Sequence, residues 1–240
     1  MAEAQRLNRY LAACGLGSRR GVEALIAEGR VAIDGVVADS PGQRVEEGVA
    51  VTVDGRPVAP DSHAYVLLNK PKNVVTTVRD THGRRTVIEL VGADRRLFPV
   101  GRLDAETTGL LLLTNDGELA ARLMHPRHGV EKTYEATVRG AVTAATAAKL
   151  AAGIDLDGRR TAPARVRVLH ATGRQSVVEI VLHEGRKRQV RRMCEAVGHP
   201  VISLHRSAYA GLRLGALKAG SSRQLLPSEV ELLRTAAAQG

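Results

Sequence analysis

The chain has 240 residues, of which 44% are hydrophobic and 25% are charged, which is the composition of a folded globular protein with one large domain or two moderate ones. The first ten residues lack the apolar run of a secretory signal, and no stretch is apolar enough to span a bilayer, so we expect a cytoplasmic protein. The net charge of +10, from 35 Lys and Arg against 25 Asp and Glu, favours a polyanionic partner such as nucleic acid.

The basic excess lies in the larger, C-terminal part of the chain. Residues 1–60 carry seven Arg and eight acidic residues, whereas residues 61–240 carry 28 basic and 17 acidic ones. One Phe, four Tyr and no Trp are too few for base-stacking sheets of the RRM or OB type. Cys14 and Cys194 form no Cys-x-x-Cys motif, and we expect both to be small buried hydrophobes in a reducing compartment.

The first 60 residues predict two short helices followed by a small sheet. Apolar residues recur at helical spacing from Leu7 to Cys14, and Ser18 is a suitable N-cap for a second helix that ends at Gly29. Alternating apolar residues at 31–33 and 49–53, each followed by an Asp-Gly turn, predict strands.

The string RLNRYLAACGLGSRRGVEALIAEGRVAIDG, residues 6–35, resembles S4 RNA-binding domains. We therefore expect a domain of this kind over residues 4–60. The resemblance implies RNA contacts from the arginines near its two helices, which are Arg6, Arg9, Arg19 and Arg20.

Residues 64–238 predict a second and larger domain. It opens with a buried strand at Val66–Leu68, a Lys-Pro turn and an alternating strand around Val74. Further strands are expected at Tyr134–Val138, Val166–Leu169 and Val177–Leu182, and helices at Glu118–Met124, Ala144–Ala151 and Arg188–Ala196. Because strands and helices do not alternate strictly, we expect an α+β fold with a mostly antiparallel mixed sheet and flanking helices.

Residues 101–117, GRLDAETTGLLLLTNDG, place a single carboxylate just before a buried strand. Leu110 to Leu113 form a fully apolar run that ends in a Thr-Asn-Asp-Gly turn, which predicts that strand. Ala105 to Gly109 form a polar loop of small residues before it, and Asp104 lies at the start of this loop. A rigid core strand can hold a reactive side chain on such a loop in place.

This string resembles the catalytic motif of RNA pseudouridine synthases, which is GRLD followed by a T-x-G-type turn and an apolar strand. The Asn69-Lys70-Pro71 turn and residues 203–233 also match the family, so that the resemblance covers residues 6–234. It is strongest for the branch that modifies ribosomal RNA and carries an N-terminal S4 domain. Large-subunit enzymes of type B match better than small-subunit enzymes, which tend to carry Lys where this chain has Arg191.

The resemblance implies a reaction in which the C1′–N1 bond of uridine is broken, the base is turned and C5 is joined to the sugar. It implies no cofactor and no metal. Asp104 would be the catalytic residue, Tyr134 would stack on the flipped uracil and help to move the C5 proton, and Leu204 would close the pocket. Arg102 would contact RNA near the vacated position, and further candidates for contacts to the RNA backbone are Lys70, Lys132 and Arg206.

A basic segment at residues 183–199, HEGRKRQVRRMCEAVGH, predicts a helix beginning near Arg188 that turns Val190 and Met193 inward. Asp104 must be ionised to act, and a guanidinium within ion-pair distance would lower the pKa of its carboxyl by about 1–3 units. The family pattern puts the basic residue of the site at Arg191, so we expect an Arg191–Asp104 ion pair. The neighbouring basic side chains would bind phosphate groups of the RNA. They are Arg186, Lys187, Arg188 and Arg192.

Other interpretations explain less of the chain. Asp104 and Glu106 are too close in sequence to define the separation of a glycosidase pair, and His125 and His128 lack a third metal ligand nearby. The string Gly92-Ala-Asp-Arg is not the glycine-rich cofactor loop of a methyltransferase. Two alternatives stay open: a small-subunit rRNA enzyme, and a non-catalytic S4-containing assembly protein. We expect a monomer that acts on rRNA or an immature ribosomal subunit.

Overall fold

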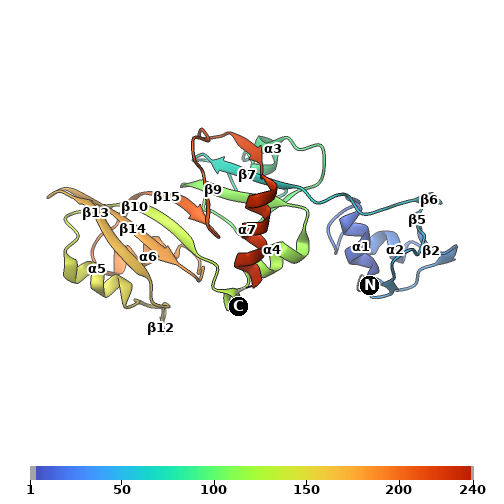
Figure 1. Ribbon diagram of the computed structural model, residues 1–240, viewed down its shortest axis with the longest axis horizontal. Helices are drawn as coiled ribbons and strands as arrows, with labels where there is room; N and C mark the ends of the chain where they lie inside the picture. The colour runs from blue at the N-terminus through green and yellow to red at the C-terminus, as the bar shows by residue number, and fades with distance from the viewer. Residues whose placement is uncertain (1–3, 239–240) are drawn as a thin grey trace. The chain divides into compact units, whose positions relative to one another are not determined.

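The computed structural model describes residues 4–238, and the chain divides into two compact units between His63 and Ala64. The first unit, drawn in blue in Figure 1, contains helices α1 (Leu7–Ala13) and α2 (Glu23–Ala27). Its strands are short: β1 (Gln5–Arg6), β2 (Val31–Ile33), β3 (Val36–Val37), β4 (Arg44–Val45), β5 (Val51–Val53) and β6 (Arg56–Pro57). Strand β1 pairs with β4, and the others form an antiparallel sheet in the order β3-β2-β5-β6.

The core of the first unit lies between the two helices and this sheet. Leu7 and Leu11 of α1 pack against Val22, Ile26 and Val31, and all five side chains are buried. The second helix begins later than the predicted N-cap at Ser18 implies. The Ser18 Oγ accepts a hydrogen bond from the N–H of Gly21 at 3.0 Å and closes a separate turn ahead of the helix.

The second unit is built on one large sheet. Its strands are β7 (Tyr65–Lys70), β8 (Phe98–Pro99), β9 (Thr107–Thr114), β10 (Lys132–Arg139), β13 (Arg165–Ala171), β14 (Gln175–Leu182), β15 (Val201–Tyr209), β16 (Leu212–Arg213) and β17 (Ser222–Gln224). A separate hairpin joins β11 (Asp155–Leu156) to β12 (Arg159–Arg160). The helices are α3 (Val87–Val91), α4 (Gly117–Met124), α5 (Ala144–Ala151), α6 (Gln189–Ala196) and α7 (Pro227–Ala238), with a 3-10 turn at Pro126–His128.

The large sheet has the order β13-β14-β10-β15-β9-β7-β17, with β16 added beside β15 and β8 beside β9. Among the pairs in the described residues, β9 and β15 run parallel and the others antiparallel. The predicted α+β fold with a mostly antiparallel mixed sheet is therefore confirmed.

Strand β9 carries four consecutive leucines because both of its faces are covered. Leu110 and Leu112 pack in a core with α4 and α7, which lie side by side in Figure 1. Leu111 and Leu113 point the other way, into a core that includes α3. A strand buried on both faces carries a continuous hydrophobic run instead of an alternating one. The run thus fixes β9 at the centre of the domain, directly after Asp104.

Two local predictions were wrong. Strand β9 begins at Thr107, so the second half of the predicted loop is already paired in the sheet. Gly109 permits this pairing, because it adopts φ +106° and a Cβ there would collide with the backbone carbonyl of Arg206 on β15. The alternating strand expected around Val74 is a single bridge between Val75 and Thr86.

Candidate active site

A buried lysine anchors the Asp104 loop. Lys70, the last residue of β7, has no exposed surface, and its Nζ donates hydrogen bonds to three carbonyl oxygens. These belong to Pro71 at 3.0 Å, Ala105 at 3.2 Å and Thr107 at 2.9 Å. Burial lowers the pKa of Lys70 to about 8, against the opposing charges of Glu106 and Asp104. The ammonium group therefore fixes the backbone on the C-terminal side of Asp104.

The segment after β7 fixes the loop on its other side. The Thr76 hydroxyl donates to the carbonyl of Leu103 at 2.8 Å and accepts from the N–H of the same residue at 3.2 Å. The N–H of Asn73 donates to the carbonyl of Ala105 at 2.9 Å. With Leu103 buried in the core beneath, the backbone around Asp104 has little freedom, which is the property needed to aim one carboxylate.

Asp104 lines a cavity of about 1160 Å³ in the second unit. This volume is ample for a nucleotide. Its cationic lining residues are Arg84, Arg102, Lys132, Arg186, Lys187, Arg188 and Arg206, and its acidic ones are Asp80, Asp104 and Glu184. Such an excess of cations draws in and concentrates an anionic ligand.

The ion pair of Asp104 is with Arg188, not with the predicted Arg191. An Nη atom of Arg188 lies 3.7 Å from the Asp104 carboxylate. Arg191 instead donates to the backbone carbonyl of Glu106 at 3.4 Å. The reason is local: Arg188 adopts a left-handed conformation at φ +53°, so α6 begins one residue later than predicted and Arg188 lies ahead of the helix, next to the loop. Desolvation lowers the pKa of Arg191, and the charge of Arg188 adds to that effect.

Tyr134 and Leu204 line the same cavity from neighbouring strands. Tyr134 is half-buried on β10, and Leu204 is buried on β15. Leu204 is the register partner of Thr107, the first residue of β9. Leu204 therefore lies close to the start of the strand that follows Asp104. The structure thus brings together Asp104, Tyr134, Leu204 and the exposed Arg102, as the sequence predicted.

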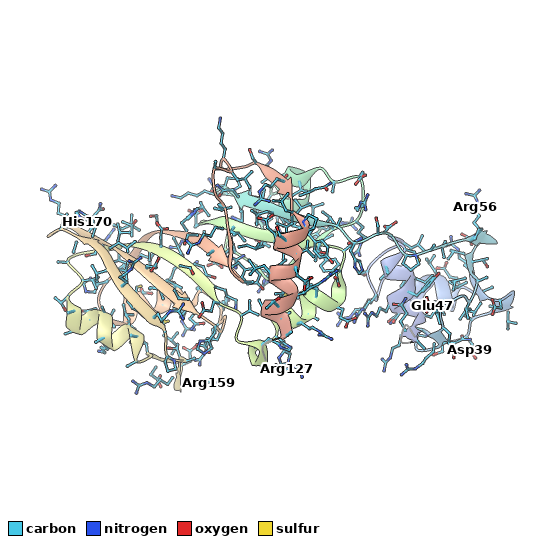
Figure 2. All side chains as sticks on the ribbon, viewed as in Figure 1. Asp39, Glu47, Arg56, Arg127, Arg159 and His170 are labelled. Atoms are coloured by element: carbon cyan, nitrogen blue, oxygen red, sulfur yellow. The ribbon has the colours of Figure 1, made fainter. Side chains whose placement is uncertain are left out.

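Three residues predicted to contact RNA are already engaged within the protein. Lys70 is wholly buried under the Asp104 loop. Arg186 donates to the carbonyls of Arg159 at 2.7 Å and Arg160 at 2.5 Å, on the hairpin marked by the Arg159 label in Figure 2. Arg192 pairs with Asp157 at 2.6 Å on the same hairpin and does not line the cavity. Arg186 and Arg192 thus hold the basic segment to β11–β12.

Arg206, also predicted to contact RNA, is 2% exposed and donates to the carbonyl of Leu110, whereas other predicted cations are more accessible. Lys187 is exposed and lines the cavity. In the first unit, Arg6, Arg19 and Arg20 are exposed, and Arg9 is half-buried on α1.

Sequence reasoning missed two polar residues that hold the site in place. Thr76 holds the Asp104 loop. The side-chain amide of buried Gln189 donates a hydrogen bond to Glu184 at 2.6 Å and accepts one from the N–H of Arg186 at 2.9 Å, which rigidifies the basic segment. Both are polar residues beside apolar neighbours, which is a weak signal in one sequence. Residues 4–238 contain no cluster of His, Cys, Asp and Glu arranged to hold a metal ion, and no helix there is long and apolar enough to cross a membrane.

Comparison with known proteins decides the family. A family model described as RNA pseudouridylate synthase matches residues 64–196, and an S4 domain model matches residues 5–51. The chain belongs to the RNA pseudouridine synthases. It is therefore an isomerase that converts uridine to pseudouridine, and the predicted enzyme class is confirmed.

Curated pseudouridine synthases are similar over the whole chain. The ribosomal large subunit pseudouridine synthase B of Bacillus subtilis (strain 168) is 43% identical, and the match covers 98% of each chain. An uncharacterized RNA pseudouridine synthase of Mycobacterium leprae (strain TN) is 46% identical, over 97% of this chain and 93% of the relative. A crystal structure of a pseudouridylate synthase superimposes with a TM-score of 0.68 at 30% identity, covering 95% of this chain and 99% of that one.

Proposed function

We propose that this pseudouridine synthase modifies a uridine of large-subunit ribosomal RNA, with Asp104 as the catalytic carboxylate. The observation that carries the proposal is Asp104 itself, anchored by Lys70 and Thr76 at the wall of a basic cavity, 3.7 Å from Arg188. The rRNA substrate is supported by the similarity to the Bacillus subtilis large-subunit enzyme.

The geometry suits a base that has left its helix. A uridine in folded RNA must be extruded before its glycosidic bond can be reached, at a cost of a few kcal/mol. The cavity can accept the nucleoside between the Tyr134 ring and Leu204, with the Asp104 carboxylate beside the sugar and base. A carboxylate can act as a nucleophile or remove a proton without a metal, so this chemistry needs only Asp104 in its ionised form.

The cations then divide into two roles. Arg188 pairs with the Asp104 carboxylate at 3.7 Å, and Arg191 supports the loop through the Glu106 carbonyl. Arg102 and Lys187, both exposed at the cavity, contact the RNA strand from which the uridine came. The first unit adds RNA contacts through its exposed arginines, Arg6, Arg19 and Arg20, together with Arg9.

We also propose domain limits of 4–60 for the S4 domain and 64–238 for the catalytic domain. In this proposal the protein is a cytoplasmic monomer and binds rRNA or an immature ribosomal subunit. Affinity should weaken as salt rises, because the contacts are largely to phosphate.

Release of tritium from 5-tritiated uridine in rRNA tests the chemistry. Asp104→Asn should abolish release while RNA affinity stays near that of the wild type. Glu106→Gln is the matched control, since Glu106 is an exposed carboxylate two residues away, and it should keep most of the turnover. Equal losses in both variants would contradict the assignment of Asp104.

Mapping pseudouridines in rRNA from cells with and without the gene tests the substrate. We expect one site in large-subunit rRNA to disappear. Loss of a small-subunit site would support the small-subunit alternative, and loss of none would contradict an rRNA substrate.

A further inference from the structure

Two cations lie next to each other at the inner wall of the cavity without an anionic partner. Arg206 comes from β15 and is 2% exposed, and Lys132 comes from the adjacent strand β10 and is half-buried. Both lie against the ring of Tyr209: the guanidinium carbon of Arg206 is 5.0 Å from its centroid, and the Lys132 Nζ is 6.0 Å away. All three residues line the cavity that contains Asp104.

The protein satisfies only part of the hydrogen-bonding capacity of these cations. The Nε of Arg206 donates to the carbonyl of Leu110 at 2.7 Å, but its Nη2 is buried with no partner. The Lys132 Nζ donates to the carbonyl of Val130 at 3.0 Å. Within residues 4–238 neither side chain forms an ion pair. An arginine left with an unpaired buried N–H group costs free energy that a bound acceptor would return.

The acidic groups nearby are committed to other partners. Asp104 pairs with Arg188, and Glu184 is held by Arg186 at 3.5 Å and by Gln189 at 2.6 Å. Burial, reinforced by the charge of Arg206, lowers the pKa of Lys132 to about 8. The charge of Glu184 offsets that of Lys132 only in part, and the buried Nη2 of Arg206 has no acceptor in the fold, so both cations keep the capacity to bind an anion.

We infer that Lys132 and Arg206 form a phosphate subsite inside the active-site cavity, which holds a phosphodiester of the RNA next to the flipped uridine. Uracil and ribose are neutral, so the phosphodiester is the group of the substrate that can balance this charge. The inference rests on the proposed function, since it places RNA in this cavity.

The sheet register places Arg206 two residues beyond Leu204 on β15. Leu204 pairs with Thr107, while Arg206 pairs with Gly109 two residues further along the parallel strand, a step of about 6–7 Å. A uridine with its base between Tyr134 and Leu204 can thus place an adjoining phosphate at Arg206 and Lys132.

Binding of uridine 3′,5′-bisphosphate by the full chain tests the subsite, with uridine as the neutral comparison. This probe carries both flanking phosphates and needs no knowledge of the natural target. Wild-type protein should bind the bisphosphate at least about tenfold more tightly than uridine, as measured by NMR titration. Lys132→Met should lose most of this difference, and Lys132→Arg, which keeps the charge, should keep it.

The matched control is Lys149→Met, because Lys149 on α5 is exposed and does not line the cavity. It should change the affinity for the bisphosphate by less than about threefold. Unchanged bisphosphate binding in a folded Lys132→Met protein would overturn the subsite, as would equal affinity of the wild type for uridine and its bisphosphate. Tritium release from rRNA by the wild type is measured separately, so failure of the proposed function is distinguishable from failure of the subsite.

Discussion

Two sets of cations surround Asp104, and the protein holds them in different ways. The strand cations are Lys70, Lys132 and Arg206; they come from β7, β10 and β15, lie at least half-buried, and each donates to a backbone carbonyl. The segment cations are Arg186, Lys187 and Arg188, from the more exposed stretch between β14 and α6. The sheet fixes the first set before any substrate arrives. In the second set, Arg186 is held by the β11–β12 hairpin and Arg188 pairs with Asp104, which leaves the exposed Lys187 to adapt to the RNA surface. The strands thus supply cations in fixed positions, and the segment between β14 and α6 supplies more exposed ones.

The largest effect should come from removing the best-anchored strand cation. Lys70→Met leaves the carbonyls of Pro71, Ala105 and Thr107 without their donor, so the free energy of unfolding should fall by about 4 kcal/mol. Urea denaturation measures it. Lys72→Met, at an exposed lysine two residues away, should change stability by less than about 0.5 kcal/mol. Equal effects in the two variants would contradict the anchoring role.

A smaller loss is expected where β9 approaches β15. Gly109→Ala places a Cβ against the Arg206 carbonyl, so the parallel pair must separate and stability should fall by about 3 kcal/mol. Gly101→Ala is the control, since Gly101 also has positive φ, at +73°, but has open space around it; about 1 kcal/mol is expected there. Thermal melting of both variants measures the difference, which is the contribution of the close approach between β9 and β15. Equal melting temperatures would contradict that contribution.

Lys132 should make ligand affinity depend on pH. The groups that face its ammonium are Arg206 and Tyr209 on β15, Tyr134 on its own strand, and Glu184 after β14. Its pKa is lowered to about 8 in the free protein, and a bound phosphate raises it again, so affinity is full below pH 8 and falls above it. A loss of up to about tenfold is expected between pH 7 and 9.

Titrations of uridine 3′,5′-bisphosphate at several pH values check this dependence. Lys132→Arg supplies the control, because its guanidinium stays charged throughout the range. Any decline common to both proteins belongs to other groups. A decline of the same size in Lys132→Arg would remove Lys132 as its origin.

The smallest effect is expected from the segment cations. Lys187→Ala should weaken RNA binding by about threefold at 0.1 M salt and lower the slope of log affinity against log salt by about 1. Fluorescence anisotropy with rRNA fragments over a range of salt concentrations measures both quantities. A loss that persists at high salt would show that Lys187 is a fixed contact, like the strand cations.

The sequence predicts the second unit well where burial determines the pattern. The four leucines of β9, the helix at Ala144–Ala151 and the inward side of α6 lie as expected, because apolar periodicity follows directly from which faces are covered. Asp104 lies on a loop before the buried strand for the same reason. These features are local consequences of patterning.

The partners of the charged residues could not be predicted in this way. In the sequence, Lys70 follows the predicted strand Val66–Leu68 and precedes a proline, a position typical of an exposed turn. The structure includes it in β7, and the pairing of β7 with β9 buries it. The exchange of Arg191 for Arg188 depends on one left-handed residue at the start of α6. Tertiary contacts and single backbone angles of this kind leave no periodic trace in a sequence.

The parallel pairing of β9 with β15 also dictates when the enzyme can become active. The hydrogen bond between Arg206 and Leu110 joins residues 96 positions apart, and the one between Asn69 and Leu217 spans 148. A ribosome still synthesising this chain has made the Asp104 loop long before the strand that completes its surroundings. The nascent protein thus carries the carboxylate that we propose to be catalytic without a pocket, and we expect catalysis to begin only once the last third of the polypeptide has emerged and docked.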